Sequence, residues 1–164
     1  MIYKLTDQDM RTHNGYQWAL NEWHETSGVG DLCGPGWLHA YDDPNLAILL
    51  NPIHANIPNP RLFQGAGEGQ RRDDLGLKYG YARMILTTEL PLPAYTTEQR
   101  VRFGIGCALS VYHEPSFVAW ATGWLNNTDR SPAAAAAARA AAEAEVDLPG
   151  IARWAMTDAP WEAS

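Results

Sequence analysis

The character of the sequence changes near residue 95, and this change constrains the fold more than any single motif. Residues 1–95 contain short β-prone runs separated by glycine, proline and asparagine, whereas apolar residues recur every three or four positions from residue 96 onward. The first pattern is typical of strands and turns, and the second is typical of amphipathic helices. We therefore predict an α+β fold, in which a small curved antiparallel sheet from the N-terminal half packs against two or three C-terminal helices.

The N-terminal part contains four strand candidates and one short helix candidate. The strand candidates are Ile2–Thr6, Tyr16–Leu20, Arg61–Gln64 and Lys78–Leu90. Asp42 and Asp43 precede Pro44 and an apolar run, which predicts a helix with an acidic cap. The glycine-rich segment 65–72 (GAGEGQRR) lacks the ending of a phosphate-binding loop, so we expect a flexible turn between two strands.

The C-terminal part predicts three helices. The first begins at Thr96, whose spacing from Gln99 fits a capping box. The expected buried stripe of this helix consists of Val101, Ile105, Ala108 and Tyr112. A second helix follows Pro115, with Trp120 and Trp124 on its buried face.

An alanine-rich tract predicts the third helix, which starts at Ser131-Pro132 and closes at Pro149-Gly150. The last fourteen residues carry Trp154 and Trp161, which we expect to fold back over exposed apolar surface.

A chain of 164 residues needs only one core, so we predict a single domain over residues 1–164. Its parts are a β-rich segment (1–95), a helical segment (96–130) and an alanine-rich helix with a tail (131–164).

The charge balance limits the partners. A formal net charge of -7 argues against binding nucleic acid through its phosphates and is compatible with a basic protein partner. The segment MIYKLTDQD reaches charged residues too early for a secretory signal, and no apolar run is long enough to cross a membrane. We therefore expect a cytoplasmic protein with no membrane partner.

The segment DLCGPGWLHAYDDP poses the question of a reactive or metal-binding site. Cys33 and His39 lack the close spacing of zinc ligands, and His24 and His54 do not supply it, so we predict no metal and no cofactor. A Cys33–His39 catalytic pair is a minor alternative. We predict a structural corner instead: Cys33 is a small buried side chain with a reduced thiol, Gly36 has a positive φ, and His39 bonds the backbone of its own turn.

Seven tryptophans are many for a chain of this length. Large aromatic side chains serve cores and also anchor protein interfaces. We take Trp18, Trp23 and Trp37 in the β-rich segment as candidate partner-binding residues.

The order of these motifs resembles a known family. Lys4, Gly15-Tyr16-Gln17-Trp18, Cys33-Gly34-Pro35-Gly36-Trp37-Leu38-His39-Ala40 and Pro44 follow one another as in an uncharacterised domain of phages and prophages. The repeated Arg-Ala-Ala-Ala composition of that family's C-terminal tail also occurs here at 139–142. The resemblance implies a phage or prophage origin and assigns no reaction.

Three functions are compatible with these observations. The first is a phage accessory protein that binds a host or defence protein without catalysis, in the manner of anti-CRISPR inhibitors. The second is an enzyme similar to small ADP-ribosyltransferases, which would use Gly34–Trp37, Pro44–Ala47 and Glu89 around NAD. The third is a virion component, and a homodimer is also possible. We favour the first, because no catalytic constellation is evident.

Overall fold

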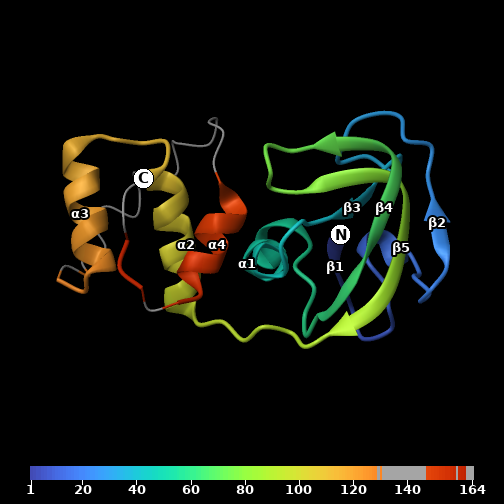
Figure 1. Ribbon diagram of the computed structural model, residues 1–164, viewed down its shortest axis with the longest axis horizontal. Coiled ribbons are helices and arrows are strands. Elements are labelled where there is room, and N and C mark those ends of the chain that lie inside the picture. Colours follow the sequence, from blue (N-terminus) through green and yellow to red (C-terminus); the bar gives the residue numbers. More distant parts are fainter. Residues whose placement is uncertain (129, 131–146, 158, 162–164) are drawn as a thin grey trace. The chain divides into compact units, whose positions relative to one another are not determined.

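The computed structural model describes residues 1–128, 130, 147–157 and 159–161. The chain forms two compact units, Met1–Ala94 and Tyr95–Ser164. The boundary coincides with the change of composition near residue 95, and Figure 1 shows the strands together with one helix in the first unit and the other labelled helices in the second. We describe each unit by itself.

The first unit contains an antiparallel five-stranded sheet, which confirms the predicted α+β class. Its strands are β1 (Ile2–Thr6), β2 (Trp23–Glu25), β3 (Leu38–Ala40), β4 (Arg61–Asp73) and β5 (Tyr79–Leu90). The strand order is β1-β4-β5-β2, and β3 also pairs with β5. A short 3₁₀ turn, η1, lies at His13–Gly15. The long hairpin of β4 and β5 is therefore the frame on which the shorter strands assemble.

The glycine-rich segment 65–72 is part of strand β4, so the prediction of a flexible turn is wrong. Residues 65–68 and 71–72 pair with β5, with register shifts between Gln64 and Gly65 and between Glu68 and Arg71. The glycines permit close approach here rather than chain reversal. At Gly67, an added Cβ would lie 2.4 Å from the ring of Tyr81. The reversal itself occurs later, where Leu77 N–H donates to the carbonyl of Asp74 at 2.8 Å.

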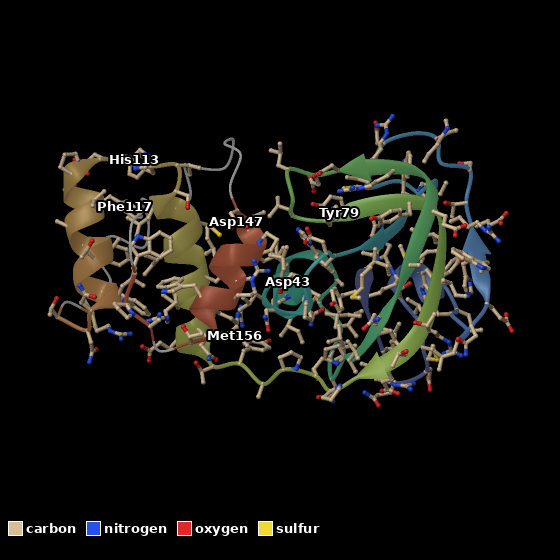
Figure 2. The ribbon with its side chains drawn as sticks, in the orientation of Figure 1. Asp43, Tyr79, His113, Phe117, Asp147 and Met156 are labelled. Atoms are coloured by element: carbon tan, nitrogen blue, oxygen red, sulfur yellow. The ribbon has the colours of Figure 1, made fainter. Side chains whose placement is uncertain are left out.

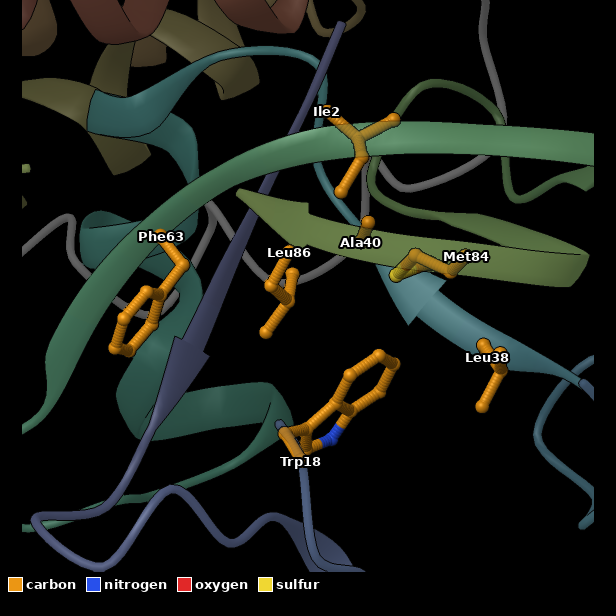
Figure 3. Close-up of a cluster of buried hydrophobic side chains, with 7 residues drawn as sticks. All are labelled: Ile2, Trp18, Leu38, Ala40, Phe63, Met84 and Leu86. Carbon is orange, nitrogen blue, oxygen red and sulfur yellow. The ribbon is translucent and has the colours of Figure 1, made fainter. Parts of the chain in front are cut away.

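The predicted strand at Tyr16–Leu20 does not form. The segment makes only isolated bridges, between Arg11 and Gln17 and between Leu20 and Leu86. Its role is instead to place Trp18 in the core. The side chains of this core cluster point toward one another in Figure 3: Ile2, Trp18, Leu38, Ala40, Phe63, Met84 and Leu86. Four strands thus contribute to one apolar interior.

Helix α1 (Pro44–His54) forms as the sequence predicts. The Asp43 carboxylate, labelled in Figure 2, accepts hydrogen bonds from the N–H groups of Asn45 at 2.8 Å and Leu46 at 3.3 Å. Pro44 occupies the first turn, where its missing N–H costs nothing. The run Leu46–Leu50 is buried, and α1 contacts β1 of the same unit.

The second unit consists of α2 (Thr97–Leu109), α3 (Pro115–Leu125) and α4 (Leu148–Ala155). The capping box of Thr96 and Gln99 is present, as predicted. Val101, which we expected on the buried stripe, is 39% exposed, whereas Ile105 and Ala108 are buried. The core cluster of this unit consists of Ile105, Ala108, Leu109, Phe117, Ala121 and Leu125.

The C-terminal segment completes this core. Trp154 and Trp161 pack against the cluster and meet edge to face, with ring centroids 4.6 Å apart. The expectation that these residues fold back is therefore confirmed. Pro149 and Gly150 lie in the first turn of α4, which begins at Leu148 and is capped by Asp147 (Figure 2), and they do not end a helix as predicted. The predicted alanine-rich helix at 131–146 lies outside the described residues. None of the described helices is long and apolar enough to span a membrane.

Candidate functional site

The Cys33–His39 segment is a hydrogen-bonded corner, which begins with a turn in which Gly34 N–H donates to the carbonyl of Asp31 at 2.8 Å. The His39 Nε2 atom bonds the carbonyl of Leu32, as the sequence predicts for a histidine that holds its own turn. Trp37 Nε1–H donates to the carbonyl of Gly30 at 3.1 Å. Two side chains that looked like functional candidates thus hold the loop in place.

Gly36 does not have the positive φ that we predicted. It is buried, and an added Cβ would lie 2.0 Å from the carbonyl oxygen of Val29. Its own carbonyl accepts a hydrogen bond from Gly28 N–H at 2.9 Å. Glycine is required at this position because two backbone segments meet there, and not because of its conformational freedom.

Burial shifts the pKa of His39 in the corner and that of His54 on α1 in the direction that disfavours the charged imidazole. Burial lowers the pKa of His39, and the positive charges of Lys4 and Lys78 lower it further, although the Leu32 hydrogen bond opposes them. Burial also lowers the pKa of His54, whose Nδ1 atom lies 3.1 Å from the Tyr41 hydroxyl. Within the described part of the chain, no three His, Cys, Asp or Glu side chains are grouped to hold a metal ion.

Cys33 differs from the prediction, because it is exposed rather than buried. Its Sγ atom accepts a hydrogen bond from Lys78 Nζ at 3.2 Å. Lys78 Nζ in turn lies 3.6 Å from a carboxylate oxygen of Asp74. The sulfur therefore faces an amine donor on the β4–β5 turn, and not the imidazole of His39, which bonds Leu32.

Two of the three proposed partner-binding tryptophans are core residues. Trp18 is 2% exposed and Trp37 is 5% exposed, so neither is available to a partner. Trp18 packs in the cluster of Figure 3 and its Nε1–H donates to the Thr12 hydroxyl at 3.1 Å. The prediction is wrong for both: Trp18 fills the core cluster, and Trp37 is buried against Gly80 of β5 with the Arg72 guanidinium over its ring.

Trp23 is the exception, with 36% of its surface exposed. It lies on β2 opposite Ile85 of β5, which in turn lies opposite Ala66 of β4. The next row across the same strands is Glu25, Arg83 and Glu68. Met84 of β5 points into the core, so its neighbours Arg83 and Ile85 face the other side of the sheet. We call these two rows the Trp23 face.

The charged row of the Trp23 face holds the indole in place. The Arg83 guanidinium lies over the Trp23 ring, 4.2 Å from its centroid. Arg83 also pairs with Glu25 at 2.8 Å and with Glu68 at 3.1 Å. One face of the ring is thus covered by a fixed cation, and two carboxylates surround that single positive charge. Trp23 is distant from Arg83 and Ile85 in the sequence, and only the pairing of β2 with β5 brings the three side chains together.

Strand β2 also presents an open backbone edge. Thr26 N–H donates to the Ala82 carbonyl at 2.8 Å, which fixes the side of the chain that bonds β5. Because these bonds alternate along an antiparallel strand, the main-chain groups of Trp23 and Glu25 point away from β5. No strand of the described residues pairs with that edge. Figure 1 shows β2 at the outer margin of the sheet.

The residues of the NAD-binding alternative do not come together. Glu89 forms a two-pronged ion pair with Arg61, with nitrogen-to-oxygen distances of 2.8 and 2.6 Å. The hydrogen bond from Arg61 lowers the pKa of Glu89. The Gly34–Trp37 corner precedes β3, where His39 pairs with Gly80, and Glu89 lies roughly 30 Å away along β5 at the usual rise per residue.

Comparison of the chain with family models, with curated proteins and with solved structures found no match. The fold and the site together define an α+β protein that carries an exposed tryptophan on an edge strand, with an arginine guanidinium over the tryptophan ring.

Proposed function

We propose that this protein is a non-enzymatic binding module that docks on a partner protein through the Trp23 face. The observation that carries the proposal is the position of Trp23: an indole that is 36% exposed, held by Arg83, on a strand whose outer edge pairs with no strand of the described residues. Tryptophan is among the residues most enriched in the energetic centres of interfaces. An indole that is already fixed before binding loses less side-chain entropy when a partner covers it.

The chemistry of the face indicates a basic, extended partner segment. Glu25 and Glu68 outnumber Arg83 on the face, and the whole chain carries a net charge of -7. An extended segment that pairs with the free main-chain groups of Trp23 and Glu25 would extend the sheet by one strand. Arginine or lysine side chains of that segment would then meet Glu25, while an apolar side chain packs on Trp23.

The resemblance to the phage domain supplies the setting of the proposal. A phage accessory protein in the host cytoplasm has host and defence proteins as its targets. Many of these carry basic grooves for nucleic acid, which an acidic face complements. Binding to such a groove would exclude nucleic acid from it without any catalysis.

The test is capture from the lysate of an infected or defence-bearing host, with three immobilised proteins: wild type, Trp23→Ala and Ile53→Ala. Ile53 is the matched control, because it is an apolar residue on α1 that is 75% exposed and lies outside the Trp23 face. Wild type and Ile53→Ala should retain the same partner, and Trp23→Ala should lose about 2 kcal/mol or more of binding free energy. Circular dichroism must show that all three are folded.

Salt dependence of the captured complex provides a second criterion. Binding that rests on charge complementarity should weaken as ionic strength rises. Retention of the partner by Trp23→Ala at wild-type affinity would refute the proposal. A dimer of the isolated protein that Trp23→Ala dissociates would assign the face to self-association and would equally refute it.

A further inference from the structure

The contact between Cys33 and Lys78 joins two segments that are distant in the sequence. The Lys78 Nζ atom lies 3.2 Å from the Cys33 Sγ atom, across a separation of 45 residues. Cys33 belongs to the corner that precedes β3, and Lys78 ends the turn between β4 and β5. Neither side chain takes part in the Trp23 face.

The two partners differ in exposure in a way that suits oxidation. Cys33 is exposed, so a small oxidant reaches its sulfur. The Lys78 side chain is only 15% exposed, and Asp74 holds its amine 3.6 Å away. The nucleophilic nitrogen is therefore kept beside the sulfur rather than free in solvent.

Competing reactions of an oxidised Cys33 are limited. The sequence contains two cysteines, and the second, Cys107, belongs to the other compact unit. Burial raises the pKa of the Cys107 thiol to about 12, so it stays protonated. A sulfenic acid condenses with a thiol or with a nitrogen, and the Lys78 amine is the nitrogen in contact with this sulfur.

We propose that Cys33 and Lys78 form a reversible oxidative crosslink, a sulfenamide between Sγ and Nζ, when the protein meets hydrogen peroxide. In the first step the thiol takes one oxygen from peroxide, which gives the sulfenic acid and one water. In the second step the Lys78 ammonium loses one proton to solvent and its nitrogen attacks the sulfur; the S–N bond forms as the S–O bond breaks, and the hydroxyl leaves with a second amine proton as water. Sulfur is oxidised by two electrons, and peroxide is reduced by two.

The bridge joins the corner to the hairpin turn and is opened by thiols. Two thiol molecules restore the Cys33 thiol and the Lys78 amine and leave as one disulfide, so electrons again balance. The oxidised protein should melt at a higher temperature than the reduced protein, because the crosslink restricts the unfolded chain.

The experiment treats the reduced full-length protein with a stoichiometric amount of hydrogen peroxide and measures intact mass and tryptic peptides. The expected product has lost two hydrogens, and trypsin no longer cleaves after Lys78. Peptide 12–61, which holds Cys33, should be joined to peptide 73–83, which holds Lys78. Dithiothreitol added before digestion should restore the original mass and the separate peptides 12–61, 73–78 and 79–83.

Two variants and one control make the test decisive. Lys78→Arg keeps a cation beside the sulfur but lacks the amine, so its Cys33 should accumulate sulfenic acid that dimedone labels. Cys33→Ser should show no change of mass at this site, and Cys107→Ser should crosslink like the wild type. Sulfinic acid at Cys33 with Lys78 unmodified, or a disulfide between two protein molecules through Cys33, would overturn the proposal.

Discussion

Lys4 lies in the core of the first unit, and its charge gives a measurable pH dependence of stability. The Nζ atom donates a hydrogen bond to the His39 carbonyl and lies 4.8 Å from the centroid of the Trp18 ring. Burial lowers the pKa of Lys4 from its ordinary value of 10.5 to about 7. We expect that replacement by methionine, which has a similar length and no charge, removes this titration.

The sign follows from proton binding in the two states. Between pH 7 and 10.5 the unfolded chain keeps the Lys4 proton and the folded chain releases it, so the wild type becomes more stable as pH rises. From pH 7 to pH 9 the wild type should gain about 2 kcal/mol relative to Lys4→Met, at about 1.4 kcal/mol per proton and pH unit. Below pH 7 both states carry the proton, and the difference should become constant.

The assay is urea denaturation of both proteins at several pH values from 6 to 9, followed by circular dichroism. The other titrating groups are common to the two proteins, so their contributions cancel in the difference, except that of His39, whose pKa the Lys4 charge lowers. A difference in the free energy of unfolding that is the same at pH 7 and pH 9 would refute the argument. It would mean that the Lys4 amine is solvated or paired in the folded state.

Three other outcomes test the remaining structural claims. Asp43→Ala should lower the free energy of unfolding by about 1–2 kcal/mol in urea, because it removes the cap of α1, and an unchanged midpoint would contradict the cap. The native protein should react with a thiol reagent at neutral pH through Cys33 alone, because Cys33 is exposed and burial raises the pKa of the Cys107 thiol to about 12. Modification of both thiols before denaturation would disprove this difference in reactivity between the two cysteines. Trp154→Ala should cost about 2–3 kcal/mol in thermal melting, since this half-buried indole packs against the helical core, and a melting curve like that of the wild type would exclude such a role.

Local signals in the sequence predicted the elements that depend on neighbouring residues. The Thr96–Gln99 capping box, the Asp43–Pro44 helix start and strands β1 and β5 all formed as expected. Capping, fixed proline φ and β-propensity act within a few residues, so the chain needs no distant partner to express them. The hydrogen bond of His39 to its own turn belongs to the same class.

The errors concern residues whose environment is set by segments far along the chain. The local sequence around Trp18, Trp23 and Trp37 does not show which of these side chains is exposed. Only the tertiary structure buries Trp18 and Trp37 and leaves Trp23 exposed. In the same way, segment 65–72 resembles a turn in isolation and becomes a strand because Tyr81 and its neighbours on β5 lie against the glycines.

The sequence by itself therefore determined the α+β class, the boundary near residue 95 and the helix caps, because these follow from local propensity and short-range periodicity. The tertiary structure alone decided that Trp23 lies beside Arg83 on the last strand of the described sheet and that Cys33 faces Lys78. Both pairs join residues 45 or more positions apart in the sequence, and such contacts exist only after the long hairpin has fixed the register of the strands.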